Sequence, residues 1–193
     1  MVGIYFYWIC WLLWVMVTFL LPRDKARTVL AIWILLTLIV SNLYISIDGY
    51  EFSISYLFIV LGGFVLLAKL SQKGLQIFST ITIMVGFTSL LIWEANAPVW
   101  IFMPRLIIIP MICVILTMMV NKHFINRITI SIIGLCSGEF LYNLLLSNYS
   151  ITHTIGDHNF LDMLCITLFL LISIELLRKV KDKLLLSFNV SKV

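Results

Sequence analysis

The sequence predicts an all-α fold, a polytopic transmembrane bundle of seven helices with its N-terminus outside and its C-terminus in the cytoplasm. The 193 residues are 62% hydrophobic and 11% charged, whereas soluble globular domains are about 45–50% apolar and about 25% charged. The apolar residues fall into runs of about 20, the length of a helix that crosses a bilayer. Lys and Arg residues alternate between these runs in the pattern that sets orientation.

The apolar runs define the predicted spans, each close to the length that crosses about 30 Å of hydrocarbon at about 1.5 Å per residue. They cover residues 2–21, 28–47, 53–70, 75–93, 98–120, 128–146 and 160–177. They lack the period-two alternation of transmembrane β-strands, so helices are expected. Residues 1–178 are the predicted seven-helix transmembrane domain, and residues 179–193 are a basic cytoplasmic tail.

The first span differs from a secretory signal peptide in the order of its charges. No Lys or Arg precedes its apolar run, whereas Arg23, Lys25 and Arg27 follow it. A signal peptide carries its positive charges first and ends in a small-residue cleavage site. The segment is therefore predicted to be a retained helix whose N-terminus lies outside.

The connections between the spans differ in charge according to their predicted side. The inside connections are 22–27, 71–74, 121–127 and the C-terminal tail. With their flanks they contain Arg23, Lys25, Arg27, Lys69, Lys73, Lys122, Arg127, Arg178, Lys179, Lys181, Lys183 and Lys192. Acidic residues gather at the predicted outside, namely Asp48, Glu51, Glu94, Asp157 and Asp162. The bias follows the positive-inside rule, and Arg105 is the one basic residue that breaks it.

The short connections leave no room for a soluble catalytic domain. Cys10, Cys113, Cys136 and Cys165 all lie inside apolar runs without CxxC spacing, so neither a disulfide framework nor a zinc site is expected. His153, Asp157, His158 and Asp162 are too irregularly spaced to predict a metal site. Asp157 or Asn159 is instead expected to cap the seventh helix. No cofactor and no nucleic-acid partner are predicted.

Arg105 and Glu139 are the ionisable residues predicted to lie deepest in the membrane. If the fifth helix begins at Pro98 and the sixth ends at Leu146, both lie about 10 Å below the outer surface. An Arg105–Glu139 ion pair is therefore expected, with Glu94 as a second acceptor for the planar guanidinium. Two alternatives stay open. Arg105 snorkels to the lipid phosphates, or the fifth helix begins nearer Pro104, which puts Arg105 at the surface.

The sixth span carries a polar stripe. Helical spacing places Cys136, Glu139, Asn143 and Ser147 on one face. Gly134 and Gly138 form a small-xxx-small pattern that allows close helix packing. The stripe either lines a path for an ion or small solute or forms hydrogen bonds that hold the bundle together. The candidate intramembrane polar network is Arg105, Glu139, Glu94 and Asn143, with no catalytic or metal-binding residues predicted.

The N-terminal aromatic segment and the short-looped layout carry a family resemblance. The segment is "IYFYWICWLLWVMVTFLLPRDKAR", residues 4–27. With the chain length, it resembles the YphA-type integral membrane proteins of Bacillus-like spore-forming bacteria. The resemblance implies a multi-pass cell-membrane protein of a family without assigned biochemistry, with spore envelope assembly as one role. No functional residue is implied by it.

Three functions follow as hypotheses. The first is a non-enzymatic protein that acts in the lipid bilayer through a membrane-protein partner or a homo-oligomer. The second is a small transporter or channel that uses Arg105, Glu139 and Asn143. The third is a lipid-modifying enzyme, for which only the 153–162 loop offers clustered His and Asp residues.

Overall fold

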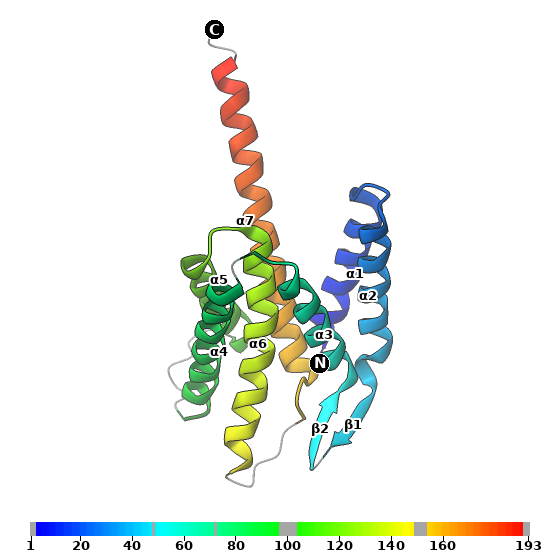
Figure 1. Ribbon diagram of the computed structural model, residues 1–193, viewed down its shortest axis with the longest axis vertical. Helices are drawn as coiled ribbons and strands as arrows, with labels where there is room; N and C mark the ends of the chain where they lie inside the picture. The colour runs from blue at the N-terminus through cyan, green and yellow to red at the C-terminus, as the bar shows by residue number, and fades with distance from the viewer. Residues whose placement is uncertain (1–2, 48, 72, 97–103, 149–153, 191–193) are drawn as a thin grey trace.

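The protein is a helical bundle with one short β-hairpin (Figure 1). The computed structural model describes residues 3–47, 49–71, 73–96, 104–148 and 154–190. Its helices are α1 (Ile4–Leu20), α2 (Lys25–Ile39), the 3-10 turn η1 (Val40–Asn42), α3 (Ile54–Ala68), α4 (Lys73–Asn96), α5 (Arg105–Val120), α6 (Phe124–Ser147) and α7 (His158–Val190). The strands are β1 (Tyr44–Ile47) and β2 (Tyr50–Ser53).

In the part of the chain that the structure describes, four helical segments are long and apolar enough to cross a membrane, judged by length and composition. They are Lys25–Asn42, Lys73–Asn96, Phe124–Ser147 and His158–Lys183. The other three apolar helices, α1, α3 and α5, have 15 to 17 residues. At about 1.5 Å per residue these helices are about 22–26 Å long, a little short of the average hydrocarbon thickness.

The predicted second span, 28–47, is wrong at its C-terminal end. The α-helix stops at Ile39, and Tyr44–Ile47 pairs as strand β1 with β2 in antiparallel register. β-branched and aromatic residues in this stretch favour a strand, and Gly49 has φ 82°, which suits a tight turn. The segment before α7 joins the hairpin, because Ser53 N donates to Ile155 O at 3.0 Å and Ile155 N donates to Glu51 O at 2.7 Å.

Two other boundaries differ from the predicted ones. Helix α5 begins at Arg105 and not at Pro98, and residues 98–103 lie outside the described part of the chain. Pro104 has extended backbone and its carbonyl accepts from Ile107 N at 2.8 Å, so the proline precedes the first turn. Helix α7 runs past the predicted span end at residue 177 to Val190 and projects beyond the other helices (Figure 1).

Helix α6 is the central element of the bundle. Close contact with α4 depends on Gly134 and Gly138, as the small-xxx-small pattern predicts. A Cβ at Gly134 would lie 2.8 Å from Ile83 Cβ, and one at Gly138 would lie 3.0 Å from the Met84 carbonyl oxygen. Thr88 Oγ1 donates to Gly138 O at 3.0 Å across the same interface. The buried core includes this contact and extends to α7, where Phe160, Leu161 and Leu164 are buried.

The outer surfaces of the helices are apolar. Helices α1 and α2 lie on the side of the molecule away from α4 and α5 (Figure 1). On that side Trp8 is 75% exposed and Phe19 77% exposed, and on α5 Met119 is 78% exposed. A protein in water does not leave so many large apolar side chains uncovered around its circumference. These surfaces suit contact with lipid acyl chains.

Candidate intramembrane polar site

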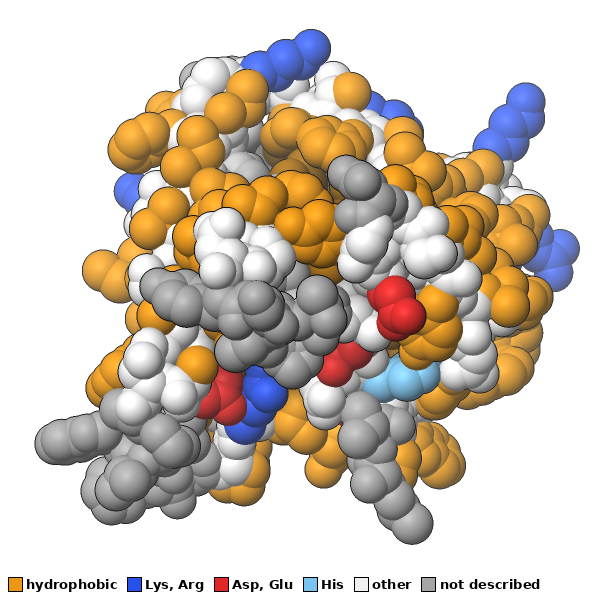
Figure 2. Space-filling view, turned by 90° about the horizontal axis from the view of Figure 1, so that it is seen from below, with side chains coloured by type: hydrophobic (Ala, Val, Ile, Leu, Met, Phe, Trp, Pro, Cys, Tyr) orange, Lys and Arg blue, Asp and Glu red, His pale blue; other side chains and the backbone are white. Residues whose placement is uncertain are grey.

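Arg105 forms an ion pair with Glu94, not with Glu139. Its Nε lies 3.1 Å from Glu94 Oε2, and the two side chains are 44% and 21% exposed. Figure 2, seen from the hairpin end, shows a basic side chain beside an acidic one on this face. Because α5 begins at Arg105, the guanidinium is in the first turn of its helix and near the last turn of α4. The assumed start at Pro98 is what made the Arg105–Glu139 ion pair a wrong prediction.

Glu139 and Asn143 form a second, buried pair on α6. Glu139 is 7% exposed and Asn143 is 3% exposed. Asn143 Nδ2 donates to Glu139 O at 2.9 Å and to Glu139 Oε1 at 3.2 Å. Asn143 Oδ1 is buried without a partner among the described residues. The candidate network therefore splits into an exposed charge pair at the helix ends and a buried carboxyl–amide pair.

The polar stripe of α6 contacts other elements at both of its ends. Tyr56 OH of α3 donates to the backbone oxygen of Cys136 at 2.9 Å. Tyr50 OH of β2 donates to Ser147 Oγ at 2.9 Å. These bonds tie the stripe to α3 and to the hairpin. This arrangement corresponds to the bundle-holding interpretation at Cys136 and Ser147. Between them, the Glu139 and Asn143 side chains make hydrogen bonds within α6 and to no other described element.

Asp162 has a role that sequence reasoning missed. Its carboxylate is 1% exposed and accepts Gly3 N at 2.9 Å and Phe6 N at 2.6 Å. The side chain thus belongs to α7 but caps the first turn of α1, where helix N–H groups lack intrahelical partners. A negative charge is also favoured by the dipole of a helix N-terminus. The two partners are 156 and 159 positions apart in sequence, so no local pattern signals the bond.

The acidic residues around the start of α7 have different hydrogen-bond partners and do not form one cluster with the histidines. Asp157 Oδ1 accepts Phe160 N at 2.8 Å, which confirms the predicted cap of α7. Asp162 is bonded to α1, and His153 lies outside the described residues. No group of three or more potential metal-ligating side chains occurs in the part of the chain that the structure describes.

A second polar cluster, also missed, lies at the opposite end of the bundle. Asn121 Nδ2 donates to Gln76 Oε1 at 2.9 Å, which joins α4 to the turn before α6. Arg127 Nε donates to the backbone oxygen of Asn121 at 2.7 Å. All three side chains are buried, with exposed fractions of 2% for Gln76 and 7% for Asn121 and Arg127. Hydropathy treats these residues as connection and helix flank, so it gave no sign of their burial.

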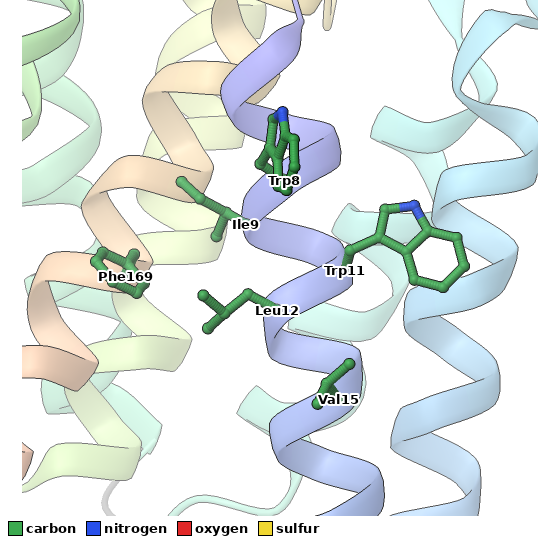
Figure 3. Close-up of a pocket in the computed structure, with 6 residues that line it drawn as sticks. All are labelled: Trp8, Ile9, Trp11, Leu12, Val15 and Phe169. Atoms are coloured by element: carbon green, nitrogen blue, oxygen red, sulfur yellow. The ribbon is translucent and has the colours of Figure 1, made fainter.

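An apolar groove runs along the outside of α1. It has a volume of about 390 Å³ and is lined by Trp8, Ile9, Trp11, Leu12, Val15 and Phe169. Figure 3 shows Ile9 and Leu12 of α1 pointing toward Phe169 of α7. Deeper between the same helices, Cys10 Sγ and Cys165 Sγ lie 3.8 Å apart without a disulfide. Apart from the indole N–H groups of Trp8 and Trp11, the side chains that line the groove are apolar.

The comparisons with known proteins agree on one family. A family model described as "YphA-like integral membrane protein" matches residues 2–192. A relative from Bacillus subtilis (strain 168), the "Uncharacterized protein YphA", is 24% identical over 176 residues, which cover 89% of this chain and 86% of the relative. No solved structure matches the chain significantly. With nearly every residue inside the family match and a bundle of apolar helices, this chain belongs to the YphA-like integral membrane protein family.

Proposed function

We propose that this protein is a non-enzymatic, multi-pass protein of the cell membrane that acts through contacts with partners in the bilayer. The observation that carries the proposal is that several interior polar groups join one element to another. Thr88 bonds the Gly138 carbonyl, Tyr56 bonds the Cys136 carbonyl, and Asn121 bonds Gln76. These groups are used between elements and are not left free for a substrate. We further propose a role in spore envelope assembly, as the resemblance to the YphA-type proteins of spore-forming bacteria implies.

The proposal includes seven spans with the N-terminus outside and the C-terminus in the cytoplasm. Arg23 and Lys25 lie near the turn between α1 and α2, at the end toward which α7 projects, and Glu51 lies in the hairpin at the opposite end (Figure 1). This separation of charge matches the positive-inside rule. The shorter helices α1, α3 and α5 span by local thinning of the bilayer, which costs only a fraction of a kcal/mol per Å of mismatch.

The surface proposed to meet a partner is the outer face of α1 and α2. Within α2 only Thr37 is buried, so the helix contributes little to the core. Phe19 on α1 and Val29 on α2 are 77% and 62% exposed. The hydrophobic effect does not drive helices together inside lipid, so membrane helices associate through van der Waals packing. The aromatic and aliphatic side chains on the outer face of the α1–α2 pair supply area for such packing.

Photo-crosslinking in living cells tests this surface. A benzophenone amino acid at Phe19 or Val29 is expected to give one discrete protein adduct, either a partner or a second copy of the chain. The matched control is Met119 on α5, which is 78% exposed on the other side of the bundle. A discrete adduct from α1–α2 and none from Met119 supports the proposal. Only lipid adducts at all three positions would contradict it.

A small transporter or channel is the second candidate, and Glu139 is the observation that favours it. A buried carboxyl inside a membrane helix commonly marks an ion or proton pathway. Its bonds within the described residues come from Asn143, whose Oδ1 is buried and unpartnered. A proton or small cation between the Glu139 carboxyl group and Asn143 Oδ1 would give both oxygens a partner.

Flux through proteoliposomes separates the two candidates. If the protein transports protons, wild-type vesicles under an imposed potential acidify internally and Glu139→Gln vesicles do not, because the amide cannot carry a proton. Glu51→Gln is the control, since Glu51 is exposed on the hairpin. Equal dye signals from wild-type, Glu139→Gln and empty vesicles would remove the proton-transport candidate.

A further inference from the structure

Arg127 is a buried arginine without an acidic partner among the described residues. It lies in the first turn of α6 and is 7% exposed. Its one side-chain hydrogen bond within the described residues runs from Nε to the Asn121 backbone oxygen, at 2.7 Å. No carboxylate lies within 4.0 Å of the guanidinium in the described part of the chain. The two Nη groups therefore have no protein acceptor there, although Arg127 carries a full positive charge.

Other positive charges gather around the same turn. Lys179 Nζ of α7 lies 5.9 Å from the centre of the Phe124 ring. Phe124 and Arg127 are three positions apart and share one face of α6. Lys122, just before the helix, is exposed. The unbonded N–H groups at the start of α6 add a partial positive charge. The turn is thus basic, while Glu175 on α7 makes no ion pair with Arg127.

A buried charge without a counter-ion is unfavourable in a low-dielectric setting. The Nη atoms are not fully shielded from solvent, so an anion can reach them and supply the missing opposite charge. The bond at Nε fixes the plane of the guanidinium, which leaves the two Nη groups as a fixed fork. Such a fork matches two oxygens of a phosphate or carboxylate and is weakly hydrated compared with a lysine ammonium.

We propose that Arg127, with Lys179 and the N-terminus of α6, binds a phosphate group, and that the headgroup of an anionic phospholipid presents it. The lipid source follows from the surroundings. Ile125, two positions before Arg127, is 64% exposed, and Met119 at the end of α5 is 78% exposed. Lipid-facing side chains therefore flank the basic turn, where headgroups of the adjoining leaflet lie. The inference does not depend on which partner or solute the protein handles.

Lipid binding to the purified full-length protein tests this site. Wild-type protein in micelles of a non-ionic, phosphate-free detergent is titrated with phosphatidylglycerol, and bound lipid is counted by native mass spectrometry. Arg127→Gln is expected to weaken phosphatidylglycerol binding roughly tenfold, the effect of losing about 1.4 kcal/mol of a charge-assisted bond. Arg23→Gln is the matched control, because Arg23 is exposed in the turn between α1 and α2. Its affinity for the lipid is expected to stay within twofold of wild type.

The outcomes separate the phosphate sources and overturn the proposal where it is wrong. Saturable binding of inorganic phosphate, lost in Arg127→Gln, without preference for phosphatidylglycerol would assign the same chemistry to a free anion and overturn the lipid source. Equal phosphatidylglycerol affinity in wild type and Arg127→Gln overturns the site itself. If Arg127→Gln does not fold, wild-type protein is labelled with phosphatidylglycerol carrying a headgroup diazirine. Adducts concentrated on residues 121–131 support the site, and adducts spread over the chain refute it.

Discussion

Asp162 and Glu139 are both buried carboxylates, but different groups satisfy them. Asp162 accepts two backbone N–H groups at the start of α1, where the helix dipole also favours a negative charge. Glu139 receives one side-chain amide from its own helix, at 3.2 Å. The charge of Asp162 is thus compensated by backbone N–H groups, and these hydrogen bonds join α7 to α1. The Glu139 carboxyl group has fewer hydrogen bonds among the described residues, which is why the transport candidate depends on it.

Replacing Asp162 is expected to destabilise the docking of α1 on α7. Asp162→Ala leaves two buried N–H groups without an acceptor, so the loss is about 2 kcal/mol, or roughly a 5 °C fall in Tm for a chain of this size. Asp162→Asn keeps one acceptor oxygen and is expected to lose about half as much. Thermal unfolding in detergent measures both. Asp182→Ala, an exposed change on the same helix, is the control, and an equal Tm for the two alanine variants would disprove the capping role.

At the scale of the elements, the α4–α6 contact is set by the absence of side chains on α6. Gly134 and Gly138 are four residues apart and lie against Ile83 and Phe87. Each lets the α4 backbone approach where a Cβ would collide. The close approach brings Thr88 Oγ1 within 3.0 Å of the Gly138 carbonyl, a hydrogen bond that a wider spacing would break.

Gly138→Ala is expected to cost about 1–3 kcal/mol of stability, because its Cβ would lie 2.8 Å from Phe87 Cδ1 and 3.0 Å from the Met84 carbonyl oxygen. The backbone oxygen cannot move aside without shifting α4. Gly74→Ala is the matched control, since a Cβ there has no atom within 4 Å and alanine favours a helix. Thermal unfolding of the two variants is compared. A Gly138→Ala protein as stable as Gly74→Ala would show that the helices are less tightly packed than described.

At the scale of the whole molecule, the two ends of the bundle differ in charge. The hairpin end carries Glu51, Asp157 and the Arg105–Glu94 pair, and the opposite end carries Arg23, Arg127 and Lys179. A charge difference of this kind sets the orientation of a membrane protein, because basic segments are retained on the cytoplasmic side. The shape of single side chains matters little to this property.

Labelling from outside the cell tests the orientation. In a variant without the four native cysteines, Glu51→Cys is expected to react with a membrane-impermeant maleimide, and Arg23→Cys is expected to react only after permeabilisation. The native cysteines are buried, so their replacement changes no exposed group. Labelling of Arg23→Cys in intact cells would invert the proposed topology.

The sequence by itself determined the helical class, the membrane setting and most helix positions. These properties depend on composition and on apolar runs, which are local sums over about 20 residues. The Gly134–Gly138 pattern likewise predicted a close helix contact, because small residues let helix backbones approach each other wherever they occur at this spacing. The cap of α7 by Asp157 was predictable for the same reason, since donor and acceptor are three residues apart.

Only the tertiary structure decided which polar groups meet. The pairing of Arg105 with Glu94 depends on where α5 begins, and the sequence left that start open between Pro98 and Pro104. The cap of α1 by Asp162 and the burial of Arg127 join segments whose contacts no local pattern encodes. The same holds for the hairpin that ends the second predicted span, because Ile155 completes it from the far side of the chain. Long-range hydrogen bonds need two surfaces brought together, and apolar periodicity specifies only that the surfaces exist.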